Sequence, residues 1–415
     1  VGIFTAFAAL ILKLLIHWIQ NFLTENFDTT EANYQYLIYP VVGIFLAGLF
    51  VRYVVKDDIS HGVTKILYAI SRRQGRIKRH NTWSSIIASS ITIGFGGSVG
   101  PEAPIVLTGA AIGSNISRLA HLNYKNTTLL LCCGAGAALA AIFKAPITGV
   151  VFVLEILMLD LTSRTVVPLL ISSITAAAIA LTIRGFDPII AISLTPDDAF
   201  RLNQIPLFVL LGIFCGLMSY YFTTVNARVG AFFKKIDSPY KKWLIGGAVL
   251  GILIYIFPPL YGEGYEGFMS LMHGNTTELF NNSLFYRFSQ IDWVVILFIV
   301  GTMFFKVIAM ASTNAAGGVG GTFAPSLFVG AFMGAITALV CNTLFGWNLS
   351  LVSFTLVGMS GVMSGVMKAP LTSIFLIAEL SSGYGLFIPL MITACIAFAI
   401  DYYLCLLYTS DAADE

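Results

Sequence analysis

Long apolar runs alternate with short polar segments along most of the chain. A transmembrane helix needs about 20 mostly apolar residues, and runs near or above this length occur at about 1–24, 37–55, 86–117, 129–159, 165–183, 205–227, 243–262, 293–305, 321–367 and 380–400. Some runs, such as 86–117 and 321–367, exceed one crossing and are interrupted by Gly and Pro. The pattern therefore predicts more helices than apolar runs, some of them partial and re-entrant, with protein or water satisfying the freed backbone groups.

The composition places this chain in a lipid bilayer. Hydrophobic residues make up 57% of it and charged residues 11%, whereas soluble domains carry roughly 25% charged residues. We therefore predict an all-α membrane protein. The net charge is only +2, but basic residues concentrate in two loops, at 72–79 and 234–242. The positive-inside rule predicts that both loops face the cytoplasm, and binding of anionic lipid head groups is the alternative.

Two blocks of sequence recur in the two halves of the chain. GPEAPIVLTGAAIG at 100–113 matches GTFAPSLFVGAFMG at 321–334, and GAGAALAAIFKAPITGVVFVLE at 134–155 matches GMSGVMSGVMKAPLTSIFLIAE at 358–379. The Gly, Pro, Lys-Ala-Pro and closing Glu positions agree without gaps within each block. The matches predict one transmembrane domain over 1–405, with repeat one at about 1–185, a linker at 186–204 and repeat two at about 205–405. The last residues turn abruptly small and acidic, which is typical of an appended, non-native tail at 406–415.

Interrupted apolar segments at matching positions of two repeats are typical of transporters with a site near the bilayer midplane. The spacing does not distinguish inverted from parallel repeats. If the repeats are inverted, both interrupted segments direct helix N-termini at one central point. The partial positive charges and unpaired N–H groups there favour an anion, without any Lys or Arg.

Glu102 is a carboxylate between two prolines inside an apolar run. Its charge would cost about 2.5–3.5 kcal/mol at the bilayer centre, and helix N-termini offset this by up to about 2 kcal/mol each. The carboxylate would then occupy the place of a permeating anion, so that proton binding and anion passage compete. The alternative is a simple helix cap. Phe323 replaces Glu102 in the second repeat, which favours function for Glu102, whereas Glu155 and Glu379 recur in both repeats, which favours a structural role such as capping.

These motifs resemble those of the CLC family of chloride channels and chloride/proton antiporters, over nearly the whole chain. GPEAP at 100–104 is similar to the family's G-R-E-G-P signature, and GTFAP at 321–325 matches its G-x-F-x-P signature. SHGVT at 60–64 aligns with G-S-G-I-P in a degraded form. The resemblance implies an inverted-repeat bundle of many tilted, partly re-entrant transmembrane helices. It also implies a bacterial inner-membrane location and a homodimer with a separate pathway in each subunit.

Carried over by position, the resemblance implies that Glu102 is the gating glutamate that blocks the anion path and accepts the proton. The backbone amides of Thr322 and Phe323 would bind the central anion, with Ala103 beside Glu102 as a further anion-binding position. The family's C-terminal tyrosine, whose hydroxyl contacts the same anion, falls near Tyr408.

Three positions depart from the family pattern. The family's anion-coordinating serine falls opposite His61, with Ser60 one place early, so His61 either donates an N–H to the anion or is a helix cap or loop residue. Pro101 has no N–H for the outer anion site. Ile156 stands where antiporters commonly carry an internal proton-transfer glutamate, and its side chain cannot relay a proton.

The favoured interpretation is chloride transport by exchange with protons through Glu102, and Ile156 supports the alternative of a passive chloride channel. Transport of another substrate by a similar fold, and a preference for fluoride, also remain open. An intramembrane enzyme is disfavoured, because there is no HExxH motif and GGVGG at 317–321 lacks the Lys-Ser/Thr of a phosphate-binding loop. We expect no metal, no cofactor and no nucleic acid. The expected partners are a small anion, protons and bilayer lipid.

Overall fold

The computed structural model describes residues 1–25, 27, 33–57, 59, 62–160, 162–184, 198, 200–273, 275–381 and 384–411. Most of the predicted linker, Ser60, His61 and residues 412–415 lie outside these ranges. Within them the chain is helical and forms no strand longer than an isolated bridge. The α-helices are α1 (Gly2–Thr24), α2 (Tyr39–Leu49), α3 (Gly62–Arg72), α4 (Ser84–Gly94), α5 (Glu102–Leu119), α6 (Tyr124–Phe143), α7 (Pro146–Ile156), α8 (Ser163–Arg184), α9 (Ile205–Lys234), α10 (Pro239–Ile256), α11 (Tyr265–Met272), α12 (Asp292–Ala315), α13 (Phe323–Phe345), α14 (Leu351–Met367), α15 (Pro370–Leu380) and α16 (Phe387–Asp411).

The expectation of more helices than apolar runs is confirmed. The run at 86–117 contains α4 and α5, the run at 129–159 contains α6 and α7, and the run at 321–367 contains α13 and α14. Eight helical segments within the described residues are long and apolar enough to span a membrane. By contrast, α7 and α15 have 11 residues each, and a helix of that length, about 16 Å, is shorter than the hydrocarbon core of about 30 Å.

The repeated Lys-Ala-Pro motif builds the same helix junction in both halves. Lys144 (φ 57°) and Lys368 (φ 56°) adopt the left-handed conformation at the C-caps of α6 and α14. The next helix of each repeat, α7 or α15, then begins directly at the proline of the motif. Proline is well suited to the first position of a helix because its missing N–H has no partner there.

Two reciprocal contacts show that the repeats are inverted. Glu155, near the end of α7, accepts hydrogen bonds from the backbone N–H of Thr372 (2.7 Å) and from its hydroxyl (2.6 Å) at the start of α15. Glu379, near the end of α15, accepts the equivalent bonds from the N–H (2.7 Å) and hydroxyl (2.5 Å) of Thr148 at the start of α7. Because the end of each helix meets the start of the other, these equivalent helices run antiparallel. The sequence favours a structural role for both glutamates, such as capping or a buried hydrogen bond, and these contacts are of that kind.

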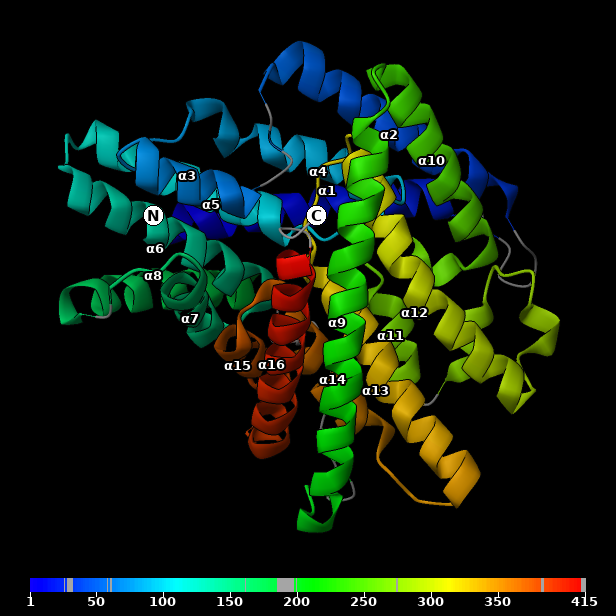
Figure 1. The fold of residues 1–415 in the computed structure, drawn as a ribbon. Coiled ribbons are helices and arrows are strands. Elements are labelled where there is room, and N and C mark those ends of the chain that lie inside the picture. Colours follow the sequence, from blue (N-terminus) through cyan, green and yellow to red (C-terminus); the bar gives the residue numbers. More distant parts are fainter. Residues whose placement is uncertain are drawn as a thin grey trace.

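Glycines of the repeated motifs allow close helix packing within each repeat. A Cβ atom on Gly109 would overlap the carbonyl of Gly134, which joins α5 tightly to α6. Gly330 and Gly358 make the equivalent contact between α13 and α14. Figure 1 shows α5 to α8 of the first repeat on one side of the molecule and α9 to α14 of the second repeat on the other. The helices whose starts carry the predicted site, α5 and α13, are thus each fixed against a neighbour of their own repeat.

Candidate functional site

The two matching GxxAP segments lie directly against each other. The N–H of Gly100 donates to the carbonyl of Gly321 (3.0 Å), and the N–H of Gly321 donates to the carbonyl of Gly100 (2.7 Å). Two residues later α5 and α13 begin. Their N-cap residues, Pro101 (φ −82°, ψ −6°) and Thr322 (φ −90°, ψ −4°), share one backbone conformation. The sequence repeat therefore brings two helix N-termini from opposite halves of the chain to one place.

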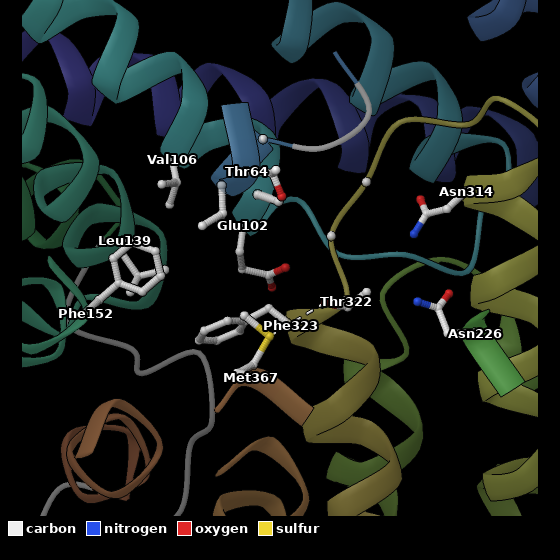
Figure 2. Close-up of a pocket in the computed structure, with 15 residues that line it drawn as sticks. Thr64, Glu102, Val106, Leu139, Phe152, Asn226, Asn314, Thr322, Phe323 and Met367 are labelled. Carbon is white, nitrogen blue, oxygen red and sulfur yellow. Dashed lines mark hydrogen bonds between the residues drawn. The ribbon is translucent and has the colours of Figure 1, made fainter. Parts of the chain in front are cut away.

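A cavity of about 190 Å³ lies at this junction (Figure 2). Among its described lining residues there is no lysine or arginine, and Glu102 is their one titratable side chain. Its polar groups are the backbone at the starts of α5 and α13, the hydroxyls of two threonines and the side-chain amides of two asparagines. The lining residues are Gly62, Val63, Thr64, Glu102, Ala103, Val106, Leu139, Phe152, Asn226, Asn314, Gly320, Gly321, Thr322, Phe323 and Met367. A cavity with hydrogen-bond donors and helix N-termini but no side-chain cation has the chemistry of a dehydrated site for a small anion.

The Glu102 side chain is buried in this cavity, with 1% of its residue surface exposed. In Figure 2 its carboxylate points toward the side of the cavity where Thr322 and Phe323 lie, below Thr64. Oε1 accepts a hydrogen bond from the Tyr265 hydroxyl (2.9 Å), whereas Oε2 has no hydrogen-bond partner among the described residues. A Cβ atom at Gly100 would overlap Oε2, so the glycine makes room for the carboxylate. Oε2 can therefore accept a proton or a further hydrogen bond without displacing a described donor.

The structure brings several predicted site residues together. Ala103, Thr322 and Phe323 line the same cavity as Glu102. Ser60 and His61 lie outside the described residues, but the positions that follow them, 62–64, line the cavity as well. The backbone of α16 continues to position 411, so that Tyr408 lies on this helix, while its side chain lies outside what the structure describes.

Two of the predicted departures from the family pattern can be placed in the fold. Pro101 is the N-cap of α5 and its ring removes one N–H from that helix start. Ile156 is the last residue of α7 and packs against the hydrophobic core. Phe152, one turn earlier on α7, lines the cavity. Among the described residues, α7 thus contributes the apolar Phe152 to the cavity, and its one carboxylate, Glu155, is already bonded to α15.

Sequence reasoning missed three polar residues of the site. Tyr265, the first residue of α11, contacts Glu102, and Asn226 on α9 and Asn314 on α12 line the cavity. For Tyr265 a signal existed, since the segment YGEGYEG at 261–267 is rich in Gly and Glu between apolar runs. Asn314 also lies just before the second GxxAP segment. Asn226 carries no comparable signal.

This arrangement defines an integral membrane protein with the inverted-repeat architecture of transporters. Interrupted helices of the two repeats meet at their N-termini, around a buried acid and a small cavity. Comparison with known proteins then identifies the family.

The family model of the voltage gated chloride channels matches residues 42–402, and the chain therefore belongs to this family, the CLC proteins. A ClcB-like chloride channel protein of Ralstonia nicotianae is 29% identical over 367 residues, which cover 87% of this chain and 80% of that protein. The H(+)/Cl(-) exchange transporter ClcA of Vibrio cholerae is 29% identical over 312 residues, which cover 73% of this chain and 62% of the transporter.

A solved structure of a slow cyanobacterial Cl⁻/H⁺ antiporter superimposes with a TM-score of 0.78 at 23% sequence identity, over 97% of this chain and 92% of the antiporter. The resemblance and the fold class that the sequence predicts are thereby confirmed. At this level of identity the structural match supports the fold, and the activity has to be argued from the site.

Proposed function

We propose that the protein moves chloride or a similar small anion across the membrane, in exchange for protons that bind Glu102. The observation that carries the proposal is the position of Glu102, buried in a cavity where the starts of α5 and α13 meet, with one carboxylate oxygen that has no hydrogen-bond partner among the described residues. The relatives are named as chloride channel proteins and as H(+)/Cl(-) exchange transporters, which supports anion transport.

In this mechanism the anion and the carboxylate compete for one place. The N–H groups at Ala103, Thr322 and Phe323, with the partial charges of the two helices, attract the negative group that occupies the cavity. When Glu102 is ionised, its carboxylate fills that role and blocks the path. Protonation removes its charge, the anion takes the place, and release of the proton reverses the exchange. Ser60 or His61, directly before the lining residue Gly62, is proposed to supply a side-chain donor, and Tyr408 a hydroxyl.

A passive chloride channel without proton coupling is the second candidate. It is favoured by Ile156, and by the lack of a second titratable group among the described residues that line the cavity. A proton that reaches Glu102 from the side of α7 would therefore have to travel through water.

We also propose the larger organisation that the sequence and the family imply. The chain forms a homodimer in a bacterial inner membrane, and the repeats divide at 186–204. Membership of a transporter and channel family leaves no role for an enzymatic reaction in this proposal.

Flux measurements on reconstituted vesicles test the function. A chloride gradient is expected to drive chloride efflux accompanied by opposite proton movement, followed with a chloride electrode and a pH electrode. Glu102→Ala is expected to keep chloride flux and abolish proton movement, because the competing and proton-binding carboxylate is gone. Glu278→Ala, at an exposed glutamate, is the matched control and should behave like the wild type. Chloride flux without protons in the wild type would establish the channel instead, and no halide movement at all would refute the proposed function.

A further inference from the structure

A second cavity, of about 330 Å³, lies beside α3 and the loop that follows it. Among the described residues its lining is strongly basic, with Lys65 on α3 and Arg73, Arg76 and Lys78 after it, and Asp57 is the one acidic residue of that set. This cavity contains part of the basic cluster that the sequence predicts to face the cytoplasm.

The described ion pairs of this lining involve its lysines. Asp57 pairs with Lys65 (2.7 Å) and with Lys78 (3.1 Å). Burial by itself raises the pKa of Asp57, but hydrogen bonds and charges from the two lysines lower it to about 2, so one negative charge is shared by two cations. Arg73 and Arg76 form no ion pair within the described part of the chain. The Arg73 guanidinium instead lies over the Tyr68 ring, 5.3 Å from its centre.

The loop that carries the arginines has a fixed shape. Gly75 adopts a left-handed turn (φ 71°), and the Ser114 hydroxyl on α5 donates to its carbonyl (2.6 Å). The same hydroxyl accepts a hydrogen bond from the N–H of Ile77 (3.0 Å). Orientation of a membrane protein by the positive-inside rule depends on the number of basic residues near a span. That rule does not require the basic residues to line a cavity, nor the loop beside it to be held by hydrogen bonds.

We infer that this cavity binds a phosphate group, carried by an anionic lipid head group or by a soluble phosphorylated compound. Guanidinium groups present planar forks of N–H donors that match phosphate oxygens, and lysines add point charges. The exposed Tyr68 and Leu67 beside the basic lining suit the glycerol end of a lipid. Basic hollows next to membrane spans are general binding sites for such head groups.

The cavity is joined to the candidate anion path through α3. Thr64, on the first turn of α3, lines both cavities. Gly62 packs so closely on Ala103 that a Cβ atom would overlap the Ala103 carbonyl. A phosphate held at the far side of α3 would therefore restrain a helix that forms one wall of the path. The binding itself stands whether or not transport is coupled to protons.

The test compares two double variants that remove equal charge from the same basic run at 72–79. Arg73→Gln/Arg76→Gln changes cavity residues, whereas Arg72→Gln/Arg79→Gln changes exposed arginines of the same run that do not line the cavity. The full chain is measured in detergent with inorganic phosphate against sodium chloride of equal ionic strength, and in phosphatidylcholine nanodiscs with and without phosphatidylglycerol. The readout in both is the unfolding temperature. The single variant Arg76→Gln keeps the Arg73–Tyr68 contact and is measured as well, so that the test still holds if the double variant does not fold.

The wild type and the Arg72→Gln/Arg79→Gln control are expected to gain stability from phosphate or from phosphatidylglycerol in a saturable way. The cavity variant should need at least about tenfold more ligand for half of the effect, because the two guanidinium groups that would bond the phosphate are gone. A response in detergent identifies a soluble phosphate, and a response confined to nanodiscs identifies a lipid. The inference would be overturned if both double variants lost the ligand-dependent gain in unfolding temperature equally. It would also be overturned if the wild type showed no such gain in either medium.

Discussion

At the scale of single residues, Tyr265 decides how firmly Glu102 stays in the cavity. Its hydroxyl is the hydrogen-bond donor to Glu102 Oε1, at 2.9 Å. Tyr265→Phe removes a bond to a charged group worth about 1.5 kcal/mol, so the carboxylate leaves the cavity more readily and chloride flux at fixed pH rises by up to about tenfold. Tyr261→Phe is the control, because this tyrosine donates to the Gly94 carbonyl (2.9 Å) and not to Glu102. Equal flux in the two variants would contradict this role.

Asp57 gives a residue-scale prediction for pH. Its pKa in the folded protein is about 2, below its ordinary value of 3.8, although burial alone would raise it, because Lys65 and Lys78 stabilise the charged form. A lowered pKa means that Asp57 stabilises the fold above its ordinary pKa and that this contribution is lost as the pH falls toward 2. Asp57→Asn should therefore lower the unfolding temperature at neutral pH. The difference from the wild type should shrink between pH 3.8 and about 2, and a constant difference across this range would show that the role is not ionic.

At the scale of helices, the contacts between α7 and α15 join the two repeats. Glu155 and Glu379 each accept hydrogen bonds from the start of the partner helix. We expect Glu155→Ala and Glu379→Ala each to lower the free energy of unfolding by about 2 kcal/mol, because buried N–H groups lose their acceptor. The Gln variants should lose less, since the amide oxygen still accepts. Unfolding by SDS in mixed micelles measures this, with Glu278→Ala as control. A large effect at only one glutamate would contradict the symmetry of the junction.

Helices could be predicted from the sequence better than the contacts between them. The apolar run at 293–305 ends before α12 does, because α12 continues through polar residues to Ala315. Thr313 is accommodated there since its hydroxyl donates to the Ala309 carbonyl (2.8 Å), one turn back. The repeated motifs predict Glu102 and Thr322 as site residues, and both line the cavity. The Tyr265–Glu102 bond joins residues 163 positions apart, and no local pattern carries such a pairing.

At the scale of the whole molecule, the two halves of one chain together form the candidate site. Both helix starts, the buried acid and the described cavity walls come from the same subunit, and they come from both of its repeats. The proposed homodimer should contain two paths that work independently.

A linked dimer with one wild-type subunit and one Glu102→Ala subunit tests this independence. The two paths see the same gradients, and the substitution in one subunit leaves the carboxylate and the helix starts of the other subunit's cavity in place. We therefore expect chloride flux close to that of the wild-type dimer, and about half of its proton movement per dimer if each subunit contributes equally. The wild-type and doubly substituted linked dimers are the two reference points, measured in the same vesicles. Proton movement that is fully retained or fully lost in the mixed dimer would mean that the subunits share one path or act in concert.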